Sequence, residues 1–312
     1  MLRTLTYNLR MMARYAFKRS ALFHRSMADI AAFRTLDPPA QHARQLEGLR
    51  AMLEAAAQTR YYAPLLEPLQ HFDDPLDQLK ALPYLTKETV RATPAAFRRP
   101  QTATVSAHTS GSTGTPLRLR RDLYCVAREE AGFFCWHQSA GWSTNDEMIV
   151  MRGDIVADVA RRTPPYGVRD VFFNRRVLSS YHLSDQTAPW YLDSIRRAGA
   201  RFLSAYPSSA YVLADYIARR GLPPLNMRAV FLGSETVTPA FHDMIAAQIG
   251  PVHAHYGTAE RGCWMTTCSA GCYHEDTQYG LTEYVPLGDG TYEIVATGLV
   301  NRAMPLLRYR TG

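Results

Sequence analysis

The spacing of apolar positions changes along the chain. Within the first hundred residues apolar positions recur every three or four residues, as in 46–56, which predicts a mainly helical region. A long helix is predicted over 121–140. Beyond it, helical segments at 189–198, 208–220 and 239–249 alternate with short apolar strands at 147–151, 201–205 and 229–232. The last stretch, 279–309, is strand-rich with glycine turns.

This order predicts an α/β fold, in which multilayer sheets are covered by helices, with a helical N-terminal region and a strand-rich C-terminal part. We expect one large domain over 1–312, made of a helical region (1–100), an α/β region (101–250) and a strand-rich region (251–312). In such sheets, ligands bind at the carboxyl ends of the strands.

Composition narrows the class of protein. The 312 residues are 46% hydrophobic and 20% charged, which is typical of a globular protein with a sizeable core. The sequence shows no apolar run long enough for a membrane span and no recognisable signal peptide, so a cytoplasmic location is expected. The net charge of +7 comes from scattered arginines, so a nucleic-acid partner is not expected.

The densest group of positive charge lies near the N-terminus, where basic residues alternate with leucines and aromatic residues: Arg3, Arg10, Arg14, Lys18, Arg19 and Arg25. A basic amphipathic helix can lie on an anionic membrane surface. It can also dock on its own domain and keep its arginines in water. The sequence favours docking over peripheral membrane contact.

Residues 109–116 are all small, hydroxylated or proline: Thr109, Ser110, Gly111, Ser112, Thr113, Gly114, Thr115 and Pro116. Backbone N–H groups and hydroxyls in such a run can surround a phosphate. The segment 102–105 before it has strand character. The run is not a P-loop, because no lysine follows Gly114. Taken alone, an ordinary solvated loop is an equally good interpretation.

Short polar segments that contain glycine also follow other predicted strands. Gly233-Ser234-Glu235 follows one predicted strand, Tyr256-Gly257-Thr258-Ala259-Glu260 follows another, and the sequence Tyr-Arg-Thr-Gly occupies 309–312. If these ends meet the hydroxyl-rich loop on one face of the sheet, they predict a nucleotide site.

These segments together resemble a known family. Residues 109–116, 256–260 and 309–312 are similar to three core motifs of the adenylate-forming enzymes, which include acyl-CoA synthetases, peptide-synthetase adenylation domains and luciferases. Within that superfamily, residues 80–312 most resemble the phenylacetate–CoA ligase group and its CapK-like branch. Further matching segments are 178–183, 206–209 and 233–235.

The resemblance implies that a carboxylic acid is activated with ATP as an acyl-adenylate, and that a thiol, usually coenzyme A, then displaces AMP. It implies that Thr109, Ser110, Ser112 and Thr113, with Gly111 and Gly114, hold the outer phosphates. Thr258 would bind the α-phosphate, and Glu260 would bind Mg²⁺. Tyr256 would stack on adenine beside Gly257, with the backbone of Gly233, Ser234 and Glu235 on the other side.

The acid pocket implied by the resemblance would be shaped by Tyr181, His182 and Tyr206, although a lone histidine is more often structural. The identity of the acid stays open. The relatives are often homodimers, so a homodimer is an expectation for this chain.

Two departures from the family pattern stand out. The motif at 309–312 normally continues into an aspartate that binds ribose, and a small C-terminal domain normally supplies a lysine. The chain contains neither, and Lys18, Lys80 and Lys87 lie in no motif. Weak turnover is therefore expected of this chain. Two alternatives stay open: an acceptor other than coenzyme A (an amine, a carrier protein or a sugar), or a non-catalytic nucleotide-binding scaffold.

Five cysteines in a chain without a recognisable secretory signal indicate a reducing compartment. Four residues close together in sequence form a candidate structural zinc set: Cys263, Cys268, Cys272 and His274. Their spacing is not that of a standard zinc finger, and ordinary core cysteines are the alternative.

Overall fold

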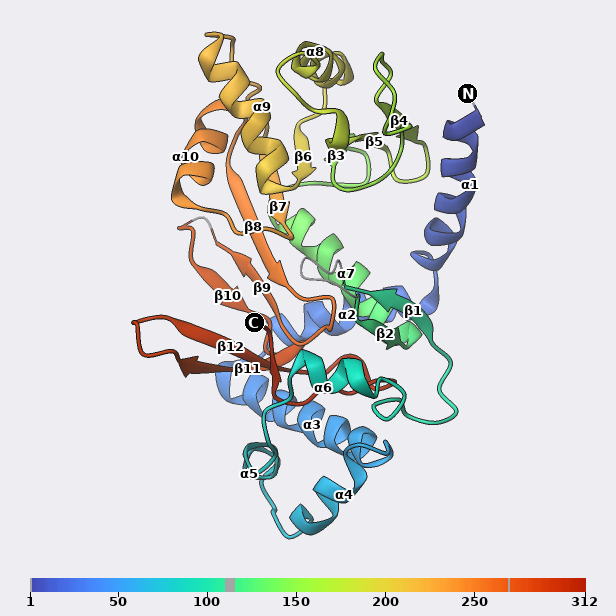
Figure 1. Ribbon diagram of the computed structural model, residues 1–312, viewed down its shortest axis with the longest axis vertical. Coiled ribbons are helices and arrows are strands. Elements are labelled where there is room, and N and C mark those ends of the chain that lie inside the picture. Colours follow the sequence, from blue (N-terminus) through green and yellow to red (C-terminus); the bar gives the residue numbers. More distant parts are fainter. Residues whose placement is uncertain (1, 110–115, 269) are drawn as a thin grey trace. The chain divides into compact units, whose positions relative to one another are not determined.

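The computed structural model describes residues 2–109, 116–268 and 270–312 (Figure 1). They form two compact units, each assembled from segments that are distant in sequence. Unit 1 contains the described residues of 2–20, 133–256 and 266–273, and unit 2 contains those of 21–132, 257–265 and 274–312. Helix α7 (Leu123–Ser139) has residues in both units.

Unit 1 is built on a mainly parallel sheet. The strand order is β8-β7-β6-β3-β5-β4, in which only the edge strand β4 is antiparallel to its neighbour. The bounds are β3 (Met148–Met151), β4 (Gly167–Asp170), β5 (Arg175–Leu178), β6 (Phe202–Ala205), β7 (Ala229–Gly233) and β8 (Val252–Gly257). Beyond β8 the order continues with β9 (Trp264–Thr267) and β10 (Tyr273–Glu275), which have residues in both units. The predicted α/β fold is confirmed.

Both faces of this sheet are covered, which explains why its central strands are apolar throughout. On one face, Ile149, Leu203 and Val230 pack against three helices: α8 (Ala188–Ala198), α9 (Pro207–Arg219) and α10 (Pro239–Gln248). On the other face, Phe202 and Phe231 pack with Trp136 of α7. Figure 1 shows α9 and α10 running beside the strands that they cover. The predicted helices and strands match these elements to within one or two residues.

Helix α1 (Leu2–Phe17) docks on the outer strand β4, as the sequence favoured. The Asn8 amide donates to the carbonyl of Arg169 at 2.9 Å and accepts from the N–H of Val171 at 3.0 Å. The ring of Tyr15 contacts the rings of Phe172 and Phe173. One face of α1 is therefore used within unit 1.

Unit 2 holds most of the helical N-terminal region and the strand-rich C-terminal part. Its helices are α2 (Ala21–Arg34), α3 (Pro38–Ala57), α4 (Ala63–Leu66), α5 (Pro75–Lys80) and α6 (Lys87–Ala92). Its strands form a hairpin of β1 (Val105–His108) and β2 (Arg118–Arg121), and a sheet of β11 (Gly280–Pro286), β12 (Tyr292–Gly298) and β13 (Tyr309–Arg310). Asp37 and Thr86 cap the N-termini of α3 and α6 through their side chains.

The core of unit 2 joins segments from both ends of the chain. Leu49 and Met52 of α3 pack with Leu117 and with Leu306, and all four side chains are buried. Strand β13 pairs with β12 and forms a parallel bridge to Leu85. In the part of the chain that the structure describes, no helix combines the length and apolar character needed to cross a membrane.

Because Leu203 is fully buried between β6 and the covering helices, Leu203→Ala is expected to lower the free energy of unfolding by about 2–5 kcal/mol. The matched control Leu287→Ala, at a side chain that is 55% exposed, should change it by less than about 0.5 kcal/mol. Urea denaturation of both variants measures the difference. Equal small losses would contradict the assignment of this core.

Candidate functional site

The hydroxyl-rich run connects the two strands of the β1–β2 hairpin. His108 pairs with Arg118, and Thr109 and Leu117 extend the pairing by one further position. The Thr109 hydroxyl accepts from the Leu117 N–H at 3.0 Å and is buried, so it helps to close the hairpin. The strand before the run lies at 105–108 rather than 102–105. Five residues predicted to bind phosphate lie outside the described residues: Ser110, Gly111, Ser112, Thr113 and Gly114.

Two of the predicted motifs meet within unit 2. The Tyr309 hydroxyl donates to Oε1 of Glu260 at 2.9 Å. Burial, and then the charge of Glu260, raise the pKa of Tyr309, so its hydroxyl stays protonated and remains a donor. Oε2 of Glu260 takes no part in this hydrogen bond. Oγ1 of Thr258 is buried and has no hydrogen-bond partner among the described residues.

The segment that carries Thr258 and Glu260 is held by buried charges. Nη2 of Arg121 donates to the carbonyl of Ala259 at 2.6 Å. Arg261 forms an ion pair with Glu129, whose side chain is 6% exposed. The hydroxyl of Tyr279 donates to the other oxygen of Glu129 at 2.5 Å. The carboxylate of Glu129 is thus satisfied on both oxygens, as a buried charge requires.

Backbone contact on the sheet of unit 2 positions the same segment. Gly280 and Gly298 are opposite each other on β11 and β12. A Cβ atom on Gly298 would lie 2.2 Å from the carbonyl oxygen of Arg261, and one on Gly280 would lie 2.2 Å from that of Gly262. Only glycine permits this close approach of the chain to the sheet.

In unit 1, the residues predicted to bind adenine lie at the carboxyl edge of the sheet. Gly233 of β7 pairs with His255 of β8, so Ser234, which follows β7, and Tyr256, which lies in β8, are both at the carboxyl ends of neighbouring parallel strands. The Glu235 carboxylate accepts from the N–H of Ser208 at 2.9 Å and from its hydroxyl at 3.0 Å, at the N-terminus of α9. The Glu235 side chain therefore caps a helix, so the backbone of the segment is the part suited to line a ligand.

Two of the three predicted acid-pocket residues come together at Gly153. The hydroxyl of Tyr181 donates to the carbonyl of Gly153 at 3.4 Å. A Cβ atom on Gly153 would lie 2.8 Å from the hydroxyl oxygen of Tyr206. Gly153 follows β3 by two residues, so this group also lies at the carboxyl edge of the unit 1 sheet.

His182, the third predicted acid-pocket residue, is held by other residues of unit 1. It is buried, its Nδ1 lies 2.8 Å from the Ser179 hydroxyl, and its Nε2 lies 2.8 Å from the carbonyl oxygen of Asp158. Its ring stacks on Tyr166. Both nitrogens are occupied by the protein, which assigns His182 to the framework of this segment rather than to a substrate.

The structure does not show the predicted zinc site. Among the described residues, which include Cys263, Cys268, Cys272 and His274, no group of three or more His, Cys, Asp and Glu side chains is arranged to hold a metal ion. Cys263 is buried, whereas Cys272 is exposed. Burial raises the pKa of the Cys263 thiol to about 12, which disfavours the thiolate that zinc requires.

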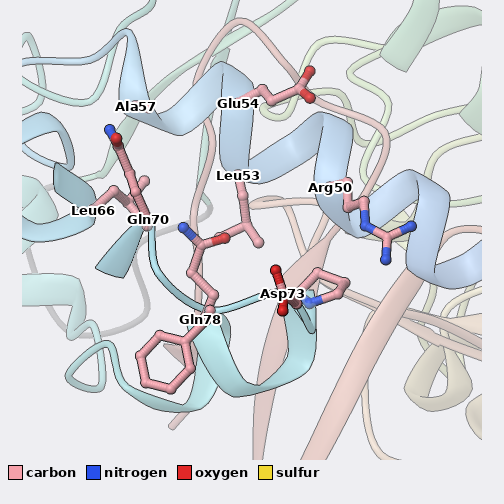
Figure 2. Close-up of a pocket in the computed structure, with 10 residues that line it drawn as sticks. Arg50, Leu53, Glu54, Ala57, Leu66, Gln70, Asp73 and Gln78 are labelled. Carbon is pink, nitrogen blue, oxygen red and sulfur yellow. The ribbon is translucent and has the colours of Figure 1, made fainter. Parts of the chain in front are cut away.

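A separate pocket lies in the helical part of unit 2. Figure 2 shows Arg50, Leu53 and Glu54 of α3 beside Asp73 and Gln78 in this pocket. None of the residues predicted to bind ligand lines it. The pocket is therefore distinct from the motifs described above.

Sequence reasoning missed the residues that act through contacts distant in sequence. Glu129 and Tyr279 carry no motif, and their role depends on the ion pair with Arg261. Arg152 directly follows β3 and belongs to none of the motifs. Its Nε and Nη2 are buried without a hydrogen-bond partner among the described residues. A single sequence contains no pattern from which such unpaired buried donors could be predicted.

Comparison with known proteins agrees with this architecture. No family model matches the chain. Protein CapK of Staphylococcus aureus is 21% identical over 237 residues, which are 75% of this chain and 53% of CapK. The chain therefore spans about half the length of the curated relative that it matches.

Solved structures give the same fold. An open conformation of 2-hydroxyisobutyryl-CoA ligase, in complex with 2-HIB-AMP and CoA, matches 86% of this chain and 67% of its own with a TM-score of 0.60 and 13% identity. The same ligase in the thioesterification state matches 89% of this chain and 64% of its own, with a TM-score of 0.61 and 15% identity. The chain shares the fold of 2-hydroxyisobutyryl-CoA ligase, which confirms the predicted fold class, and its sequence is similar to that of CapK.

The variant Glu129→Gln removes the negative charge of the buried ion pair while it keeps the shape of the side chain. Because Arg261 is then left with an uncompensated charge, the free energy of unfolding should fall by about 3–5 kcal/mol. The control Glu88→Gln, in an exposed pair with Arg91, should cost less than about 1 kcal/mol. Chemical denaturation measures both. A loss in Glu129→Gln no larger than in the control would show that the pair does not hold the segment.

Proposed function

We propose that this protein activates a carboxylic acid with ATP as an acyl-adenylate and transfers the acyl group to a thiol, with coenzyme A as the acceptor. The observation that carries the proposal is the hydrogen bond between Tyr309 and Glu260, because it joins two of the motifs that the sequence shares with adenylate-forming enzymes. The fold and the likeness to CapK support it. The finer assignment to the phenylacetate–CoA ligase and CapK-like group is part of the proposal.

Within the proposal, unit 2 supplies groups for the phosphates. The unpartnered hydroxyl of Thr258 is suited to donate to the α-phosphate. Glu260 would hold Mg²⁺ through Oε2, since Oε1 accepts from Tyr309. Mg²⁺ is commonly bound by one or two carboxylates together with substrate phosphates, so a single carboxylate fits its needs. The ion would neutralise charge on the phosphates.

Unit 1 supplies groups for the rest of the substrates. The backbone of Gly233 and Ser234 and the ring of Tyr256 lie at the carboxyl ends of adjacent parallel strands and are suited to the two faces of adenine. Tyr181 and Tyr206, which meet at Gly153, would border the acid. The carboxyl edge of a parallel sheet is the usual location of such ligands.

The variants Thr258→Val and Tyr309→Phe distinguish the proposed contact of Thr258 with the α-phosphate from the proposed binding of Mg²⁺ by Glu260. Loss of the Thr258 hydroxyl should weaken AMP and Mg·ATP alike by roughly tenfold, the effect of one hydrogen bond to a charged group. Loss of the Tyr309 hydroxyl should weaken Mg·ATP several-fold and leave AMP without Mg²⁺ unchanged, because it acts on Glu260. Titration calorimetry measures the four affinities.

The control for this experiment is Thr35→Val, whose exposed hydroxyl bonds only its own helix. It should bind both nucleotides as the original protein does. The proposal fails if the original protein binds neither AMP nor Mg·ATP. The choice of acceptor is tested by acid-dependent AMP release, which should rise when coenzyme A is added and not when an amine is added.

A second, independent proposal concerns α1. We infer that its free face contacts an anionic lipid surface. Leu5, Leu9 and Met12 lie along one side of the helix and are 59%, 57% and 51% exposed. The first 28 residues contain no acidic residue, and the arginines of α1 are complementary to anionic headgroups.

The double variant Leu5→Ser/Leu9→Ser tests this contact. The original protein should sediment with vesicles of phosphatidylcholine that contain phosphatidylglycerol, and not with phosphatidylcholine alone, and added salt should weaken the binding. The double variant should lose binding, whereas Leu287→Ser, at an exposed leucine elsewhere, should keep it. Equal binding of all three proteins, or no binding, would contradict the role of α1.

A further inference from the structure

Arg152 is a cation that the protein does not neutralise. It directly follows β3, at the edge where the parallel strands β3, β6, β7 and β8 end. Its Nε and Nη2 are buried without a hydrogen-bond partner among the described residues. Burial lowers the pKa of its guanidinium, which reflects the cost of keeping this charge out of water. Buried donors are almost always satisfied in proteins, so a missing ligand is the simplest partner.

An aromatic ring and a glycine lie beside the guanidinium of Arg152, and two tyrosine hydroxyls lie beside the residue that follows it. Its guanidinium lies over the ring of Phe133, with Cζ 5.9 Å from the ring centroid. A Cβ atom on Gly233 would lie 3.7 Å from Nη2 and 3.3 Å from the carbonyl oxygen of His255, so glycine keeps this approach open. The next residue, Gly153, is the meeting point of the hydroxyls of Tyr181 and Tyr206. The cation thus borders the residues proposed to surround the acid.

No acidic side chain among the described residues forms an ion pair with Arg152. The exposed carboxylate of Asp154, two residues further on, acts on it through its charge without a hydrogen bond. The neighbouring strands β4 and β5 pair Arg175 with Asp170 instead. The Nε and Nη2 donors of Arg152, which have no hydrogen-bond partner among the described residues, match the two oxygens of a carboxylate.

We propose that Arg152 binds a second carboxylate of the acid substrate, so that the substrate is a dicarboxylic acid. This inference rests on the proposed function. The reacting carboxylate is a poor partner for Arg152, because a charged two-point hydrogen bond would draw electron density away from the oxygen that attacks the α-phosphate. That carboxylate also loses its charge when it becomes an anhydride. A second carboxylate stays charged throughout and keeps Arg152 satisfied.

Direct binding to the 312-residue protein tests the subsite without any requirement for turnover. The probes are matched pairs that differ by one carboxylate: glutarate with butyrate, and phthalate with benzoate. Calorimetry should show the diacid binding at least tenfold tighter than its monoacid partner. Arg152→Gln should abolish that preference and Arg152→Lys should retain part of it. The control Arg220→Gln, at an exposed arginine over Tyr216, should retain all of it.

Thermal unfolding of the same variants separates a binding role from a structural one. Arg152→Gln removes a buried, unpartnered charge, so its Tm should equal or exceed that of the original protein. A fall of several degrees would mean that Arg152 is needed for folding, and would overturn the proposal. An equal loss of AMP affinity in Arg152→Gln, whichever acid is present, would assign the residue to the nucleotide and overturn it as well.

Acid-dependent exchange of pyrophosphate with ATP separates this inference from the function on which it rests. Exchange that depends on diacids and is lost in Arg152→Gln supports both. Exchange that monoacids support equally well overturns the subsite and leaves the function intact. Diacid binding through Arg152 without exchange by any acid leaves the subsite intact and overturns acid activation.

Discussion

A buried carboxylate, that of Glu129, is the constraint on which the part of unit 2 proposed to bind phosphate depends. In a low-dielectric interior it requires a cation and a donor, and Arg261 and Tyr279 supply them. Because Arg261 directly follows Glu260, this ion pair fixes the backbone that presents Glu260 to Tyr309. The glycines at 280 and 298 let that backbone lie against the sheet. A motif recognisable in sequence is therefore oriented by residues that belong to no motif.

In unit 1, by contrast, a buried charge, that of Arg152, has no ion-pair partner among the described residues. The parallel strands of unit 1 end at a common edge, where the hydroxyls of Tyr181 and Tyr206 lie near Gly153. At the same edge, Nε and Nη2 of Arg152 are buried without a hydrogen-bond partner in the part of the chain that the structure describes. A fully satisfied interior would be more stable. Sites of function are where proteins commonly depart from local rules of stability, and the loss is offset by burial elsewhere, here between the sheet and its covering helices.

The sequence predicted the fold well where local pattern and burial agree. Strands β3, β6 and β7 are apolar because both faces are covered, and this pattern is readable without a structure. It missed β4 and β5, because Arg169, Arg175 and Arg176 interrupt the apolar pattern, and the partner of Arg176, Glu147, comes from another part of the chain. The hydrogen bonds of His182 and the burial of Cys263 could not be predicted for a related reason, since they depend on contacts and not on residue type.

The central claim is that this protein activates a carboxylic acid rather than serving as a nucleotide-binding scaffold. The most direct measurement is the exchange of labelled pyrophosphate into ATP by the purified protein, screened against mono- and dicarboxylic acids with Mg²⁺. The account predicts exchange that requires an acid and Mg²⁺ and that is lost in Thr258→Val. Tight binding of Mg·ATP without exchange for any acid would contradict it and would favour the scaffold.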